Sequence, residues 1–136
     1  MNQQLIYYPC LAMIFLTCLV MFVMFSRRVK AIKQKSVSLK HFKTYSTDDV
    51  VPEQALQAAR NYTNLLETPT LFYMVCIFTF LFHRVDILSL MLAWCFVALR
   101  IIHSYIHITH NNVVHRMRTF ALSWLIILIL ATKLAF

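Results

Sequence analysis

Four long apolar stretches make up most of this chain of 136 residues, and they indicate membrane-spanning helices. A helix rises about 1.5 Å per residue, so about 20 apolar residues cross a hydrocarbon layer of about 30 Å. The sequence predicts spans at about residues 5–25, 55–82, 87–108 and 114–136. With 60% hydrophobic residues and no glycine, the chain is too apolar for a soluble domain of this length. We therefore predict one domain over residues 1–136, an all-α integral membrane bundle of four transmembrane helices.

Positive charge is concentrated beside the first apolar stretch. The formal net charge is +8, and seven of the 13 Lys and Arg residues lie between Arg27 and Lys43. Basic connections remain on the cytoplasmic side of a membrane. This placement predicts a long cytoplasmic connection over residues 26–54 with both chain ends outside, and it argues against a nucleic-acid partner. The first span has no basic residue before it and no cleavage motif after it, which indicates an uncleaved anchor. Without a transit or retention signal, we expect a bacterial inner membrane.

Three polar side chains occur at helical spacing where the second span begins. Arg60, Asn64 and Glu67 are separated by four and three residues, so they share one helix face. An arginine, an amide and a carboxylate at the mouth of a membrane span are costly without partners. The sequence therefore predicts that other spans supply polar groups at the same depth.

The third span carries a second polar stripe. Arg100, His103 and His107 again fall on one helix face. The short connection near Arg84 predicts that the second and third spans form an antiparallel pair, which places Glu67 level with Arg100. Both lie roughly 20–25 Å from that connection, in the cytoplasmic half of the bundle.

Further arginines approach the same depth from the other two spans. Arg27 and Arg28 end the first span, and Arg116 begins the fourth. One interpretation is that Glu67 and Arg100 form an ion pair that only stabilises the bundle. The excess of cationic groups instead favours a site for an anionic ligand, such as a small peptide with carboxylates and a thiolate. Arginine beside a thiol favours the thiolate, which is the nucleophilic form.

These residues resemble a known family. RNYTNLLETP in the second span, RIIHSYIH in the third and the later Arg116 are similar to the membrane-associated proteins in eicosanoid and glutathione metabolism (MAPEG). The family includes microsomal glutathione transferases and glutathione-dependent eicosanoid synthases. The resemblance covers nearly the whole chain, and LLETPTLFY is more similar to the less characterised bacterial branch.

The resemblance implies a homotrimer that binds glutathione between neighbouring subunits near the cytoplasmic face. It implies that Arg116 stabilises the glutathione thiolate and is the catalytic residue. The reaction would be transfer of glutathione to a lipophilic electrophile from the bilayer, or reduction of a lipid hydroperoxide, with glutathione as co-substrate and no metal. The residues that would hold glutathione are Arg60, Asn64, Glu67, Arg100, His103, His107 and one or both of Arg27 and Arg28.

Two positions depart from the catalytic members of that family. His107 stands where many have a tyrosine in the third span, and Phe120 where some have one early in the fourth. A histidine can still hydrogen-bond a ligand, but phenylalanine cannot. These departures leave open whether the chain retains turnover.

Three other functions remain as alternatives. A metal centre could use His103, His107, His110 and His115, although the neighbouring arginines oppose a cation. A small four-span transporter could use Glu67 as its proton-coupled carboxylate. The third is a non-catalytic bundle that binds an anionic ligand, a lipid or a partner protein.

The cysteines indicate neither a disulfide framework nor a zinc site. Cys10, Cys18, Cys76 and Cys95 occur singly in apolar sequence without a CxxC pair. We expect buried free thiols.

Overall fold

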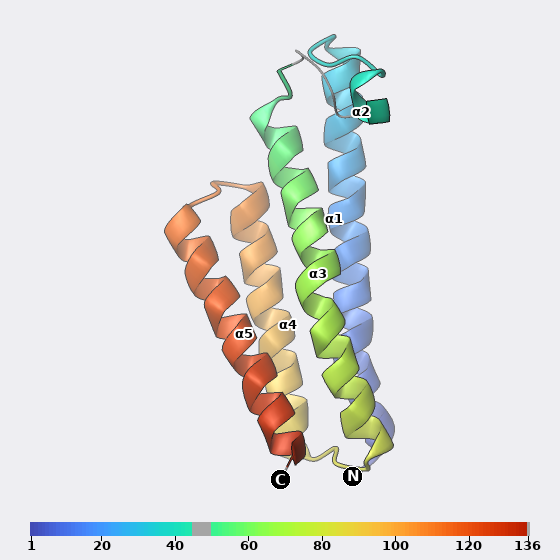
Figure 1. Ribbon diagram of the computed structural model, residues 1–136, viewed down its shortest axis with the longest axis vertical. Coiled ribbons are helices and arrows are strands. Elements are labelled where there is room, and N and C mark those ends of the chain that lie inside the picture. Colours follow the sequence, from blue (N-terminus) through green and yellow to red (C-terminus); the bar gives the residue numbers. More distant parts are fainter. Residues whose placement is uncertain (45–49, 136) are drawn as a thin grey trace.

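The computed structural model describes residues 1–44 and 50–135, and this part of the chain is built from helices (Figure 1). Four of the described helices are long and apolar enough to cross a membrane. The predicted all-α, four-span membrane bundle is therefore confirmed. In chain order the elements are the 3-10 helix η1 (Gln3–Ile6), α1 (Tyr7–Lys33), α2 (His41–Thr44), α3 (Glu53–Leu81), α4 (Ile87–Ile108) and α5 (Val113–Ala135).

The long helices form two antiparallel pairs. The most extensive contacts join α1 to α3 and α4 to α5, and α3 packs on α4 between the pairs. Both chain ends and residues 82–86 lie at one end of the bundle, here called the terminal end (Figure 1). The opposite end, with the basic connection after α1, is called the basic end. Because α3 has 29 residues and α4 has 22, α1 and α3 extend beyond the other pair there.

Helix α1 is longer than the apolar stretch that predicts it. The sequence places the end of this span at Phe25, whereas the helix continues to Lys33. Residues 26–33 contain no helix breaker, and the chain turns only at Lys35, whose φ is 55°. Arg27 and Arg28 therefore lie on a rigid helix instead of in a loop.

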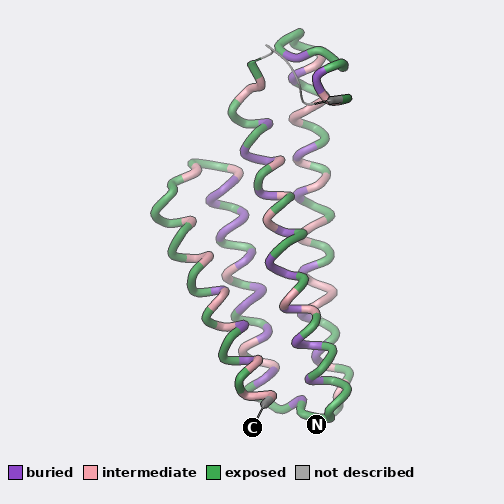
Figure 2. Tube along the Cα trace, viewed as in Figure 1, coloured by how far each residue is buried: buried purple, intermediate pink, exposed green. Residues whose placement is uncertain are grey.

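The apolar core lies along the inner faces of the helices (Figure 2). Phe72 of α3 and Phe96 of α4 are both 0% exposed, and their rings stack with centroids 4.2 Å apart at 14°. Met13 of α1 and Leu130 of α5 are also buried in this cluster. An offset aromatic pair adds about 0.5–1.5 kcal/mol beyond burial, so this stack fastens α3 to α4 at the centre of the bundle.

A polar cluster closes the terminal end. The Asp86 carboxylate caps α4 by accepting from the Ser89 amide at 2.8 Å, and it pairs with Lys133 of α5 at 2.8 Å. The Lys133 ammonium and the Ser89 donors hold the pKa of Asp86 below its usual range. Within residues 1–44 and 50–135 this is the only ion pair. It joins the end of α5 to the start of α4.

Replacing Phe72 by alanine should destabilise the bundle by about 3 kcal/mol, because it removes the stacked ring and leaves a cavity. The matched control is Phe78→Ala, because Phe78 lies on the same helix and is 41% exposed. Thermal unfolding in detergent should show a clear fall in Tm for Phe72→Ala and little change for Phe78→Ala. Equal effects would contradict the described core.

Candidate functional site

A cavity of about 690 Å³ lies in the basic half of the bundle, between α3, α4 and α5. We call it the polar cavity. Its lining residues are Arg28, Ala59, Arg60, Thr63, Asn64, Glu67, His103, His107, Val113, Arg116, Met117 and Phe120. The structure thus brings together, around one space, most of the residues that the sequence singles out.

The polar cavity has an excess of positive charge. Arg28, Arg60 and Arg116 line it, and Glu67 is the one acidic residue of the lining. One wall is apolar and includes Met117 and Phe120 from α5. A space with cationic groups on one side and apolar groups on the other suits a ligand that is anionic at one end.

On α3 the polar stripe lies at the edge of the buried face. Asn61 and Leu65 are buried, whereas Arg60 and Glu67 are exposed and Asn64 is half-buried. At about 100° per residue, Asn64 is turned about 40° from Arg60 toward Asn61, and Glu67 about 20° the other way. Asn64 is therefore the member of the stripe nearest to α4.

This rotation decides the partner of Arg100. Its guanidinium is 0% exposed, and Nη2 donates to the Asn64 side-chain oxygen and, at 3.5 Å, to the Asn64 carbonyl. The sequence places Arg100 level with Glu67, but it contacts Asn64, one helical turn away. Arg100 does not line the polar cavity. It lies behind Asn64 and orients that amide. The Glu67–Arg100 ion pair, which is one interpretation of the sequence, is absent among the described residues.

A second polar contact between α3 and α4 is not anticipated from the sequence. Asn61 is 0% exposed, and its side-chain oxygen accepts from the Ser104 hydroxyl at 3.2 Å. The antiparallel pairing that places Glu67 level with Arg100 also places Asn64 level with Ser104, so both interhelical contacts are displaced by about a turn from the predicted ones. The signal that could have found Asn61 is its spacing of three from Asn64 in NYTN.

His103 connects α4 to the start of α5. Its Nδ1 lies 3.1 Å from the Arg116 carbonyl oxygen and 3.2 Å from the Thr119 hydroxyl. A carbonyl can only accept, so Nδ1 carries the proton. The ring also lies beside Phe120, with centroids 6.0 Å apart. His103 thus fixes the first turn of α5 and, with it, the backbone that carries Arg116.

The Arg116 side chain is held from the other side. Its Nη1 donates to the side-chain oxygen of Asn111, in the α4–α5 connection. Asn111 has a φ of 50°, which asparagine tolerates better than most residues. The connection is therefore shaped so that its amide holds the guanidinium at the cavity.

The structure distinguishes Arg27 from Arg28. Arg27 donates to the carbonyl oxygens of Gln54 at 2.9 Å and Ile108 at 2.6 Å, which joins α1 to the ends of α3 and α4. Arg28 lines the polar cavity, and its guanidinium carbon lies 5.3 Å from the centre of the Phe42 ring. Adjacent helical residues point about 100° apart, so only Arg28 contributes to the cavity.

The histidines differ in their surroundings. His103 and His107 are buried and line the cavity, whereas His110 and His115 are exposed. His107 Nδ1 is buried and has no hydrogen-bond partner within the described parts of the chain. No group of three or more His, Cys, Asp or Glu suited to a metal ion occurs among the described residues. His107 therefore lines the cavity, while its Nδ1 is enclosed by the protein.

The model of the MAPEG family matches residues 6–136, which is nearly the whole chain and includes every residue of the polar cavity. No curated protein and no solved structure matches this chain.

Replacing Asn64 by alanine should destabilise the bundle by about 2–3 kcal/mol, because it removes an acceptor from a buried charged donor. The matched control is Thr63→Ala, since Thr63 also lines the cavity but its hydroxyl bonds only to the Ala59 carbonyl of its own helix. Thermal unfolding in detergent compares the two. An Asn64→Ala variant as stable as Thr63→Ala would show that Arg100 does not depend on Asn64.

Proposed function

The chain belongs to the MAPEG family, and from this premise we propose that it is a membrane-bound glutathione-dependent transferase or peroxidase. Its substrate would be a lipophilic electrophile or a lipid hydroperoxide. Glutathione would bind in the polar cavity as co-substrate.

The observation that carries the proposal is the charge of the polar cavity. Glutathione has two carboxylates, one ammonium group and a thiol, so its thiolate form has a net charge of −2. Arg28, Arg60 and Arg116 against Glu67 give the cavity lining a net charge of +2. The arginines would receive the carboxylates and the thiolate, and Glu67 would receive the ammonium group. The site therefore complements this ligand in number and sign of charges.

The position of Arg116 supports its role at the thiol. The His103 contact to its carbonyl and the Asn111 contact to its guanidinium hold it against the apolar wall with Phe120. A cation in such a low-dielectric setting stabilises a thiolate strongly. The thiolate would then attack the electrophilic carbon of a conjugation substrate, or the terminal oxygen of a hydroperoxide.

The lipophilic substrate would enter from the bilayer. Val113 and Met117 line the cavity yet are 65% and 63% exposed, so the apolar wall continues onto the surface that faces lipid. A substrate dissolved in the membrane could reach the thiolate along this wall. His107 lines the cavity from α4 and would hydrogen-bond the ligand there.

Family membership and charge distribution also support an assembly and an orientation. We propose a homotrimer, because Arg60 and Glu67 are exposed and a neighbouring subunit could cover them and complete the site. The basic connection after α1 supports an orientation with both termini outside and the polar cavity toward the cytoplasm. We propose that the membrane is a bacterial inner membrane. The partners would be further copies of the chain and membrane lipids, with no nucleic acid.

Three substitutions test this assignment. Arg116→Ala should lower kcat by about 100-fold or more, as loss of a transition-state donor does, while some glutathione binding remains. Arg60→Ala and Glu67→Ala should lose binding itself. Conjugation of a chlorodinitrobenzene and reduction of a lipid hydroperoxide measure turnover, and calorimetry measures binding.

The matched control for these variants is Arg118→Ala. Arg118 lies two residues from Arg116 but is exposed and does not line the cavity, so its loss should leave binding and turnover unchanged. Unmodified activity in all four variants would refute the assignment. Binding without turnover in the natural protein would instead identify a non-catalytic glutathione-binding bundle.

A further inference from the structure

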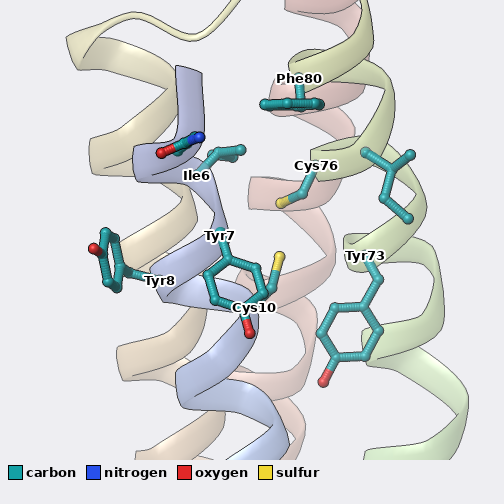
Figure 3. A pocket seen from close by; sticks show the side chains of 9 residues that line it. Ile6, Tyr7, Tyr8, Cys10, Tyr73, Cys76 and Phe80 are labelled. Carbon is teal, nitrogen blue, oxygen red and sulfur yellow. The ribbon is translucent and has the colours of Figure 1, made fainter. Parts of the chain in front are cut away.

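A second cavity lies in the terminal half of the bundle, between the start of α1 and the second half of α3 (Figure 3). It has a volume of about 590 Å³, and we call it the thiol cavity. Its lining residues are Gln4, Ile6, Tyr7, Tyr8, Cys10, Tyr73, Cys76, Ile77 and Phe80. None of them is charged, and none is shared with the polar cavity. The two cavities are therefore chemically distinct.

Two thiols from distant parts of the sequence meet in this cavity. Cys10 of α1 and Cys76 of α3 both line it, and Cys10 packs against the buried cluster that contains Cys76. Figure 3 shows one thiol entering from each helix. Cys10 is half-buried, whereas Cys76 is 1% exposed. Both thiols line the cavity, and Cys10 is the more accessible of the two.

The remaining cysteines differ in position. Cys18 and Cys95 are exposed on the outside of the bundle, so the expectation of buried thiols is wrong for these two. Their small apolar side chains need no polar partner at these positions. They provide an internal comparison for any reaction that depends on the cavity.

We propose that Cys10 and Cys76 form a dithiol site that reduces a lipid hydroperoxide taken up into the thiol cavity from the bilayer. The Cys10 sulfur attacks the terminal peroxide oxygen, so an S–O bond forms and the O–O bond breaks. The alkoxide takes the Cys10 proton and leaves as an alcohol. Cys76 then attacks the resulting sulfenic acid, an S–S bond forms, and water leaves with the Cys76 proton. Two thiols are oxidised to a disulfide and one hydroperoxide is reduced.

The chemistry of the lining selects this substrate class. A neutral cavity inside a membrane span excludes glutathione, because nothing there compensates its carboxylates. Apolar side chains such as Ile77 and Phe80 suit an acyl chain. The Gln4 amide and the Tyr7 and Tyr73 hydroxyls offer hydrogen bonds to a hydroperoxide group. Because α1 packs on α3 and both thiols line the same cavity, a disulfide between them would join two neighbouring helices.

The test uses the full chain in nanodiscs, with linoleic acid hydroperoxide and no glutathione. Remaining thiols are blocked with N-ethylmaleimide, disulfides are reduced and labelled, and peptides are measured by mass spectrometry. We expect Cys10 and Cys76 to be lost together as a linked pair, with one alcohol released per chain. Cys18 and Cys95 should remain reduced. Oxidation of Cys18 or Cys95 as fast as Cys10, or a Cys10 that stays reduced, would overturn the proposal.

Variants separate this site from the polar cavity. Cys76→Ser should stop at a sulfenic acid on Cys10, which dimedone traps, and Cys10→Ser should leave Cys76 reduced. Cys18→Ser and Cys95→Ser are the matched controls and should behave as the natural protein. Arg116→Ala should retain the dithiol reaction, because Arg116 does not line the thiol cavity. This variant therefore tests the dithiol reaction separately from glutathione-dependent turnover. A dithiol reaction lost in Arg116→Ala, or unchanged in Cys10→Ser, would contradict the proposed site.

Discussion

The burial of one guanidinium inside a membrane bundle shapes the rest of this structure. Arg100 is 0% exposed, and Asn64 supplies the acceptors that it uses. A buried charge is costly without hydrogen-bond partners. Asn64 supplies them for Nη2 of Arg100, whereas Nε and Nη1 have none among the described residues. The Asn64 contact holds α3 and α4 in the rotation that brings Asn64 to Arg100. The Asn61–Ser104 contact reinforces that rotation one turn nearer the basic end. Since no carboxylate neutralises Arg100 within the described residues, its charge adds to the positive potential behind the polar cavity.

The fixed rotation of α3 against α4 determines which side chains line the polar cavity. The rotation that sends Asn64 inward leaves Arg60 and Glu67 at the edge, where they line the cavity. On α4 the same rotation turns His103 toward α5, and its bond to the Arg116 carbonyl sets the position of that helix. At the other end of the bundle the thiol cavity has no charge at all. One helix pair, α1 and α3, thus contributes to two cavities that favour an anionic and a neutral ligand respectively.

Much of this arrangement is predictable from the sequence, and the remainder depends on packing. Span number follows from apolar length, and the stripes containing Arg60 and His103 follow from helical spacing. The partner of Arg100 could not be predicted, because a rotation of α3 by tens of degrees decides between Asn64 and Glu67. Arg27 and Arg28 are likewise adjacent in sequence. Because their side chains leave α1 in different directions, Arg27 joins the helix ends and Arg28 lines the cavity. The meeting of the Cys10 and Cys76 thiols depends on the contact of α1 with α3, for which single cysteines give no signal.

We propose that the polar cavity binds glutathione and stabilises its thiolate. Calorimetry on the detergent-purified protein, with an ultraviolet absorbance scan for thiolate, tests it most directly. The charge complementarity predicts saturable binding, with thiolate present near neutral pH because Arg116 lies at the cavity. No binding at millimolar glutathione would contradict this role of the polar cavity, and its excess of arginine would then have to bind another anion.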